Sequence, residues 1–336
     1  MRFPVNKPLL EGNENKYLKD CIDSGWISSE GEYVKKFEKK LAEKFDRKYA
    51  VAVTNGTVAL DIAVDTLGLK KGDEVIVPSF TIVSCIMGIL RNGLVPVFID
   101  CNIEDFNIDP YKISKHISPK TKAIMVVHIY GMPVNMNPIL KIADEYNLKV
   151  IEDAAEVIGQ TYYNKPCGSF GDISTMSFYA NKHITTGEGG VVLTDNENYY
   201  DKISSYRNLF FNNERRFKHY DLGYNARMTN IQAALGLAQL ENIDKNIKKK
   251  RLIGNQYHKQ LEEIENIILP VKRYEYAENI YWVFGVLLTD SNYNYMNQIV
   301  DKLKKRGVGT RPFFWPLHLQ PVLKKFDFKI DESICP

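Results

Sequence analysis

Short apolar segments with strand character alternate with segments of helical spacing along the first half of the chain. The strand-like segments are 50–53, 74–77, 95–99, 123–128 and 149–152, and the helical ones between them are 58–67, 84–91, 110–117 and 136–146. This alternation predicts an α/β domain with a mainly parallel sheet that is covered by helices on both faces. In such sheets ligands bind at the carboxyl ends of the strands, so the residues after each strand are candidates for a site.

The first of these turns, Thr54-Asn55-Gly56-Thr57, joins a strand to a helix through small residues. Free N–H groups and the helix dipole point at one spot at such a helix start, which suits an anion. An ordinary βα turn that binds nothing has the same pattern. The turns at 78–81, 128–131 and 153–156 would lie at the same edge of the sheet.

A single lysine, Lys182, lies in a run of hydroxyls and glycines between 174 and 190, and strand-like residues 191–194 follow it. Glycines let the backbone approach a ligand closely, and neighbouring hydroxyls can bind a phosphate. A lysine held in such a turn can act as a Schiff-base amine once burial or nearby charge lowers its pKa. The alternative is a surface turn with a solvated lysine.

Asp153 ends the strand-like segment 149–152 and also has two interpretations. A carboxylate at this place commonly caps the next helix. It could instead pair with a protonated ring nitrogen, the partner that a pyridoxal phosphate (PLP) ring requires when it takes up electrons.

The second half of the chain predicts a smaller domain. A helical pattern from 228 to about 264 would lead from a large domain, residues 1–240, into a C-terminal α+β domain, residues 241–336, with a strand at 281–288 and a helix at 295–306. The basic run 248–251 is expected on the solvated face of the long helix.

Composition excludes several classes of protein. The 336 residues carry a net charge of only +3 with both signs interspersed, so neither nucleic acid nor a membrane surface is an expected partner. Five scattered cysteines without CxxC spacing predict no disulfide frame and no metal site, and a reducing cytoplasm fits them. The N-terminal residues have no signal-peptide pattern and no apolar run is long enough for a bilayer.

Five motifs in a fixed order together resemble one protein family. They are Thr54-Asn55-Gly56-Thr57-Val58-Ala59-Leu60, Val77-Pro78-Ser79-Phe80-Thr81, Glu152-Asp153-Ala154-Ala155-Glu156, Ser177-Phe178 with Asn181-Lys182 and Thr185-Thr186-Gly187-Glu188-Gly189-Gly190, and Gly223-Tyr224-Asn225-Ala226-Arg227-Met228-Thr229-Asn230. The chain resembles the DegT/DnrJ/EryC1/StrS family of PLP-dependent nucleotide-sugar aminotransferases, which have the aspartate-aminotransferase (type I) fold with a seven-stranded mixed sheet. The segments 310–314 and 316–321 resemble the GDP-perosamine synthase branch in particular.

The resemblance implies a role for each matching residue. Lys182 would form the internal aldimine with PLP and then carry protons, and Asp153 would pair with the pyridine nitrogen. Gly56, Thr57 and Ser177 would hold the phosphate, joined by Asn225 from the other subunit of a homodimer. Further contacts follow from position: Ile82 and Glu156 would lie against the cofactor, and His318 and Arg311 would bind the sugar substrate.

Three positions depart from the family pattern. Ile82 replaces an aromatic residue, and Ala226 is smaller than usual, so less bulk is expected near the acceptor. Family members also finish the small domain with a segment that this sequence, ending at Pro336, does not contain. We therefore expect either a truncated chain or a small domain that is closed differently.

The resemblance leaves alternatives open for the reaction. The first expectation is transfer of an amino group from L-glutamate to a keto-sugar nucleotide such as GDP-4-keto-6-deoxymannose, for surface polysaccharide synthesis. The small residues also allow a smaller phosphorylated ketone as acceptor. A sugar dehydratase of the family would carry histidine at the lysine position, and Lys182 argues against it; His183 is expected to be structural. A non-catalytic regulator would not need Lys182 and Asp153, and a dinucleotide-binding dehydrogenase would need GxGxxG at the first turn.

Overall fold

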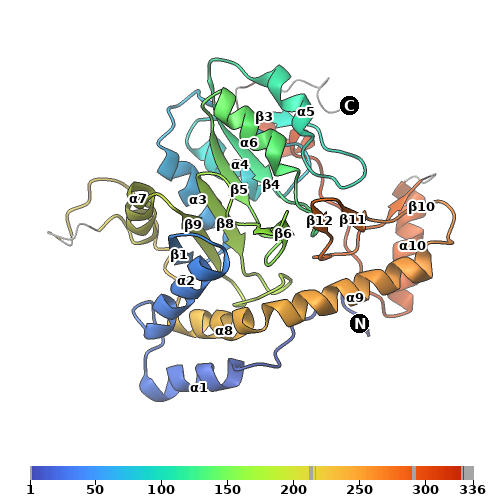
Figure 1. Cartoon of the computed structure of the whole chain (residues 1–336), viewed down its shortest axis with the longest axis horizontal. Helices are drawn as coiled ribbons and strands as arrows, with labels where there is room; N and C mark the ends of the chain where they lie inside the picture. Colours follow the sequence, from blue (N-terminus) through green and yellow to red (C-terminus); the bar gives the residue numbers. More distant parts are fainter. Residues whose placement is uncertain (1, 212–214, 216, 290–292, 327, 329–336) are drawn as a thin grey trace.

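The computed structural model of the 336-residue chain describes residues 2–211, 215, 217–289, 293–326 and 328. A seven-stranded sheet lies at its centre, in the order β1-β9-β8-β5-β4-β2-β3 (Figure 1). Neighbouring strands run parallel except where β9 pairs with β1 and with β8. The strands are β1 (Tyr49–Val53), β2 (Glu74–Pro78), β3 (Val95–Ile99), β4 (Thr121–Val127), β5 (Lys149–Asp153), β8 (Ile173–Ser177) and β9 (Gly190–Thr194). This is the predicted mainly parallel mixed sheet.

Helices cover both faces of the sheet, because successive strand residues point to opposite faces. Ala50 and Ala52 belong to one hydrophobic core and Val51 and Val53 to the other. The first core is completed by α2 (Glu32–Lys44), α6 (Met136–Glu145), α8 (Asn230–Glu241) and α9 (Ile243–Leu261). The second is completed by α3 (Gly56–Leu67), α4 (Ser84–Arg91) and α7 (Glu197–Arg207).

The remaining elements are short or peripheral. Helix α1 (Glu14–Ser24) packs along α8, and α5 (Pro110–Ile113) continues into the 3-10 turn η1 (Ser114–His116). Three two-stranded pairs add β6 (Thr161–Tyr162) with β7 (Lys165–Pro166), β10 (Ile267–Ile268) with β13 (Leu287–Leu288), and β11 (Arg273–Tyr274) with β12 (Ala277–Glu278). Helix α10 (Tyr293–Lys305) and the 3-10 turns η2 (Leu317–Leu319) and η3 (Pro321–Lys325) follow.

Two predictions for the second half were wrong in detail. The single long helix is two helices, because the chain turns at Asn242, whose backbone N–H bonds back to Gln239 and Leu240 as α8 ends. The predicted strand at 281–288 is a strand only at Leu287–Leu288, because the backbone at Tyr281 takes the left-handed conformation with φ of +46°.

Both ends of the described chain return to other parts of the fold. Phe3 pairs with Val308, beside the end of α10. Leu317 and Leu323 are buried in the same core as α3 and α4, so the last described turns pack on the sheet domain. The division into residues 1–240 and 241–336 stays a prediction, and the predicted boundary falls at the last turn of α8.

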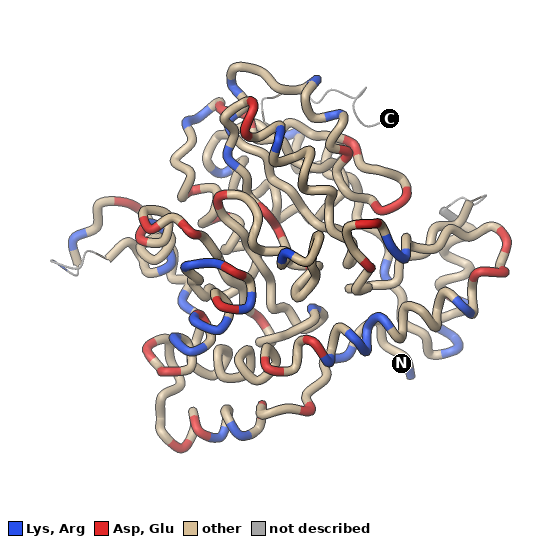
Figure 2. Tube along the Cα trace, in the orientation of Figure 1, with Lys and Arg blue, Asp and Glu red and all other residues tan. Residues whose placement is uncertain are grey.

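Positively and negatively charged residues are interspersed along the trace, as the composition indicates (Figure 2). Among the described residues, no helix is both long and apolar enough to cross a bilayer.

Candidate active site

Lys182 lies in the loop between β8 and β9, and hydrogen bonds from the loop's own hydroxyls and amides shape that loop. Thr185 Oγ1 and the N–H of Thr186 both donate to the carbonyl of Phe178, at 2.9 and 3.0 Å. Gly187 takes φ of +82°, a conformation that glycine adopts without steric cost. The Lys182 side chain is only 10% exposed. The alternative of a solvated lysine on a surface turn is therefore wrong.

The amine of Lys182 is enclosed by an acid and an aromatic ring. Its Nζ lies 3.8 Å from Glu156 Oε1 and 3.8 Å from the centroid of the Trp282 ring. Burial lowers the pKa of Lys182, and the negative charges of Glu156 and Asp153 oppose that shift. Burial raises the pKa of Glu156, which the charge of Lys182 opposes. Burial therefore favours the free amine of Lys182, and the two carboxylates favour its ammonium form.

Asp153 ends β5 and is 4% exposed. Its Oδ1 accepts the N–H of Ala155 at 3.0 Å, and the thiol of Cys85 donates weakly to Oδ2 at 3.6 Å. Burial raises the pKa of Asp153, while the Ala155 N–H and Lys182 favour its charged form. Residues 154–160 form turns that lead to β6, so no helix follows for Asp153 to cap.

A second group of predicted residues meets at the start of α3. Asn55 caps the helix by accepting the N–H of Val58 at 2.9 Å, and the first N–H groups of a helix have no partner within it. A Cβ on Gly56 would lie 2.6 Å from the Cβ of Ser177, so only glycine allows this approach. Thr57 Oγ1 lies 2.8 Å from Ser84 Oγ at the start of α4. Amides and hydroxyls converge here, as the sequence predicts.

Two other residues that were predicted to contact the cofactor, Ile82 and Asn225, are exposed. Ile82 is 45% exposed, directly before α4. Asn225 is exposed, and Thr229 caps α8 through a capping box with Gln232, so capping is not the role of Asn225. Ala226 is buried in the second core and therefore widens no open site.

The two predicted substrate contacts lie on the C-terminal segment. His318 is half-buried in η2, with its ring centroid 6.5 Å from that of Phe98. Arg311 is exposed, and its guanidinium donates to the carbonyl of Thr310. The amine of Lys182 contacts Glu156 and Trp282, which come from other parts of the chain than these two residues.

Sequence reasoning missed Trp282, and it included Tyr130 only as part of the turn 128–131 at the edge of the sheet. The N–H of Tyr130 donates to Glu156 Oε2 at 2.9 Å, and its ring packs on Trp282, Phe313 and Phe314. Tyr130 lies in the turn after β4, and Trp282 follows the left-handed residue Tyr281, a hundred positions from Lys182. No motif marks either of them.

His128, Glu152 and Cys167 form a compact buried group beside the site, with possible ligand atoms within 4.8 Å. The carboxylate of Glu152 already accepts the N–H groups of Gly168 and Phe170 and the hydroxyl of Ser174. His128 Nδ1 accepts the N–H of Val134, so Nε2 carries the proton that is donated to Glu152. His128 and Glu152 therefore have their hydrogen-bond partners within the core.

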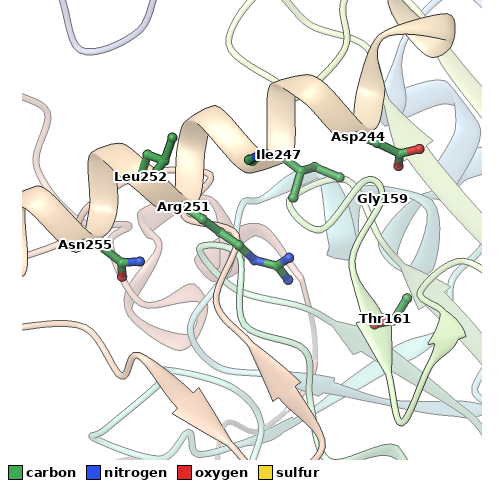
Figure 3. A pocket seen from close by; sticks show the side chains of 8 residues that line it. Gly159, Thr161, Asp244, Ile247, Arg251, Leu252 and Asn255 are labelled. Carbon is green, nitrogen blue, oxygen red and sulfur yellow. The ribbon is translucent and has the colours of Figure 1, made fainter.

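A separate cavity lies between α9 and the β6–β7 hairpin (Figure 3). Its volume is about 420 Å³, and none of its lining residues belongs to the predicted site: Gly159, Thr161, Asp244, Ile247, Lys248, Arg251, Leu252 and Asn255. The prediction of a solvated basic run holds only in part here, since Lys250 and Arg251 are half-buried.

The sequence profile of the DegT/DnrJ/EryC1/StrS aminotransferase family matches residues 8–334. The chain belongs to this family. Two relatives are similar over most of both chains. A GDP-perosamine synthase from Escherichia coli O157:H7 is 43% identical over 95% of this chain and 86% of its own length, and one from Caulobacter vibrioides is 40% identical over 99% and 90%.

Among solved structures, the E. coli GDP-4-keto-6-deoxy-D-mannose-3-dehydratase with bound hydrated PLP matches this member of the DegT/DnrJ/EryC1/StrS family with a TM-score of 0.89. Its sequence is 28% identical, and the match covers 98% of this chain and 90% of that one. The predictions of a type I fold and of a PLP-dependent aminotransferase are confirmed.

The residues present fit PLP. The close approach of Gly56 to Ser177 leaves the amides of the α3 N-terminus beside two hydroxyls, the donor set that a phosphate needs. Asp153 is a buried carboxylate and Lys182 a buried amine, which suit a ring nitrogen and an aldehyde. Individual roles at this site stay predictions.

Proposed function

We propose that this aminotransferase moves the amino group of L-glutamate to a 4-keto-6-deoxy sugar carried on GDP, in the cytoplasm and for surface polysaccharide synthesis. The supporting observation for the acceptor is 40–43% identity to two GDP-perosamine synthases over nearly the whole chain. The buried pair of Lys182 and Asp153 supports the chemistry, because amine transfer needs a neutral amine and a fixed carboxylate together.

Bound PLP would supply an aldehyde that captures amines and a ring that takes up electrons. The N–H groups of Gly56 and Thr57, with the hydroxyls of Thr57 and Ser177, would hold its phosphate at the start of α3. Asp153 would keep a proton on the ring nitrogen, because a buried carboxylate stabilises a positive partner. Lys182 Nζ would accept and return protons, since burial keeps its pKa low.

Glu156 would hold the amine of Lys182 on its own side of the site. Its other oxygen is fixed by the N–H of Tyr130, so the carboxylate cannot turn away. The rings of Phe80, Phe313 and Phe314 pack together and on Tyr130, and they would exclude water from this side.

We further propose a homodimer in which Asn225 reaches the phosphate site of the partner subunit. Three large apolar side chains of the loop before Asn225 are 66–90% exposed: Phe217, Tyr220 and Leu222. Apolar side chains gathered on one exposed loop favour an interface over free solvent.

A PLP-dependent dehydratase is the second candidate, since such an enzyme has a TM-score of 0.89 to this chain. The resemblance gives dehydratases a histidine at the position of Lys182. His183, the adjacent residue, is 4% exposed and its Nε2 faces the carbonyl of Ile280 at 3.4 Å, so it is not available as a substitute. Transfer of the amino group to a smaller phosphorylated ketone is the third candidate function.

A panel assay distinguishes these functions. Purified enzyme with PLP and L-glutamate is incubated with GDP-4-keto-6-deoxymannose, other keto-sugar nucleotides and simple keto-phosphates, and products are identified by mass. We expect an amino sugar on GDP together with 2-oxoglutarate. Loss of a hydroxyl from the sugar would instead support a dehydratase, and amination of only the keto-phosphates would support the small acceptor.

A further inference from the structure

Trp282 lies against the amine of Lys182 although the two residues are a hundred positions apart. The ring centroid is 3.8 Å from Nζ, and the indole is 7% exposed. A positively charged or polarised amine is attracted to the face of an indole ring, and more strongly where water is excluded. The ring therefore forms one wall of the space in which Nζ can move.

The same indole also fixes the backbone next to Lys182. Its Nε1 donates to the carbonyl of Asn181 at 2.9 Å. The side-chain amide of Asn6, from the N-terminal segment, donates to that carbonyl as well. Two donors from distant parts of the chain thus meet on the peptide that carries Lys182.

The turn that presents Trp282 is closely fitted to the end of β4. Asn279 Oδ1 accepts the N–H of Tyr281 at 2.7 Å, and Tyr281 has φ of +46°. A Cβ on Gly131 would lie 2.6 Å from the N of Tyr281 and 2.8 Å from that of Trp282. A left-handed conformation at a tyrosine is costly, and it persists only where its surroundings enforce it.

Helix α9 supports the turn from the other side. Lys250 Nζ donates to the carbonyl of Trp282 at 3.1 Å. A Cβ on Gly254 would lie 2.3 Å from the Tyr281 ring, so the ring lies directly on the helix backbone. The position of Trp282 is therefore set by β4, by α9 and by its own turn.

We propose that Trp282 is a positioning residue for Lys182. The face of its ring restricts the positions that Nζ can occupy, and its N–H fixes the Asn181 carbonyl. Together these contacts orient the amine of Lys182 before the cofactor binds. This inference rests on the proposed role of Lys182. In that role the amine forms a C=N bond to the aldehyde carbon of PLP, and the aldehyde oxygen leaves as water.

Two binding measurements separate positioning from general damage. Pyridoxamine 5′-phosphate offers the same ring and phosphate but has no aldehyde, so its affinity reports the non-covalent site alone. The rate of the absorbance change when PLP meets the full-length apoenzyme reports formation of the covalent bond. In Trp282→Leu we expect the pyridoxamine phosphate affinity within twofold of wild type and the covalent rate at least tenfold lower, because misplacement of about 1 Å can cost a hundredfold.

Milder substitutions measure separately the two contacts of the indole, its ring face with Nζ and its N–H with the Asn181 carbonyl. Trp282→Phe keeps a ring face but loses the N–H, and Asn6→Ala removes the other donor to Asn181. We expect each to lower the covalent rate several-fold, and the double substitution to lower it further. Tyr257→Leu is the matched control, because its ring stacks on Phe284 in the same region and not on Lys182; both measurements should match wild type.

The remaining outcomes count against the proposal. An unchanged covalent rate in Trp282→Leu would show that the contact is incidental. A parallel fall of both measurements in Trp282→Phe would show that Trp282 only shapes the cofactor site. Lys182→Ala serves as the reference. A covalent bond between PLP and that variant would exclude the proposed role of Lys182 itself. Loss of the bond in Lys182→Ala, together with wild-type rates of bond formation in the Trp282 variants, would overturn only the inference about Trp282.

Discussion

Glu156 Oε1 lies 3.8 Å from Lys182 Nζ, and its other oxygen accepts the N–H of Tyr130. Glu156 therefore stabilises the ammonium form of Lys182, while burial favours the free amine. The balance between these two effects decides the pH at which the lysine becomes a nucleophile.

Glu156→Gln should shift this balance toward the free amine. Glutamine can still accept the Tyr130 N–H, so the change removes mainly the charge. Without that charge the pKa of Lys182 falls, because the largest opposing interaction is lost. Asp153 and Cys85 also face Lys182 and remain in the variant. The measurement is the pH dependence of reductive methylation of Lys182 in the apoenzyme; an unchanged or higher midpoint would contradict the prediction.

Lys182→Ala should abolish covalent PLP binding, seen as loss of the visible absorbance of the bound cofactor. Lys250 is the best comparison, because burial also lowers its pKa, to about 8. Its Nζ donates a hydrogen bond to the Trp282 carbonyl and lies outside the group formed by Asp153, Glu156 and Lys182. Lys250→Ala should keep the absorbance. The assignment fails if the absorbance persists in Lys182→Ala.

Asp153→Asn should leave folding intact and lower turnover by several orders of magnitude. The amide can still accept the N–H of Ala155, so the local turn is preserved. It carries no negative charge for a protonated ring nitrogen, and that charge acts where electron density develops during the reaction. Single-turnover kinetics on the holoenzyme, with circular dichroism as the folding control, make the comparison. Near-normal turnover would leave Asp153 with a structural role only.

His183→Gln should reduce the loss of stability at mildly acidic pH. Burial and the positive charge of Lys250 lower the pKa of His183 to about 3, so the folded protein holds it neutral. The unfolded chain binds a proton below about pH 6.5, so the contribution of His183 is present above that pH and declines as the pH falls toward 3.

Between pH 7.5 and 5 the stabilising contribution of neutral His183 falls by about 2 kcal/mol of unfolding free energy. Denaturant unfolding of wild type and His183→Gln at equal protein concentration measures the difference. His116→Gln makes the same chemical change in η1 and serves as the comparison. An identical pH dependence in wild type and His183→Gln would show that His183 does not titrate as the structure indicates.

The sheet could be predicted from sequence because each strand is a short apolar run followed by small or polar residues. The segment 95–99 and the helix 84–91 were predicted with the bounds that the structure shows. The residues after the strands, such as Asp153 and Thr57, were found for the same reason, since a parallel sheet brings these positions to one edge.

Trp282 could not be found in this way. The apolar residues from 281 to 288 read as a strand, but the left-handed turn at Tyr281 directs Trp282 to Lys182 instead. That turn depends on Gly131 and Gly254, which approach it only in the folded chain. Local pattern carries no information about such distant contacts.

Complementation between two inactive variants should show whether the active site is shared in a homodimer. Asn225 is exposed in the single chain, and the helix α8 is already capped by Thr229. The side chain of Asn225 is therefore available to a partner subunit. Lys182→Ala and Asn225→Asp should each be nearly inactive: the first lacks the amine, and the second places a negative charge near the phosphate.

In a mixed dimer with composite sites, both defects fall into one site. The other site then contains wild-type Lys182 from one subunit and wild-type Asn225 from its partner. If subunits exchange at random, half of the dimers are mixed and each mixed dimer has one intact site of two. Activity should therefore recover toward a quarter of the wild-type level. The measurement is activity of a refolded equimolar mixture, with mass spectrometry to verify mixed dimers. If Asn225 served the site of its own chain, every site in the mixture would carry one defect. No recovery despite verified exchange would therefore exclude the shared site.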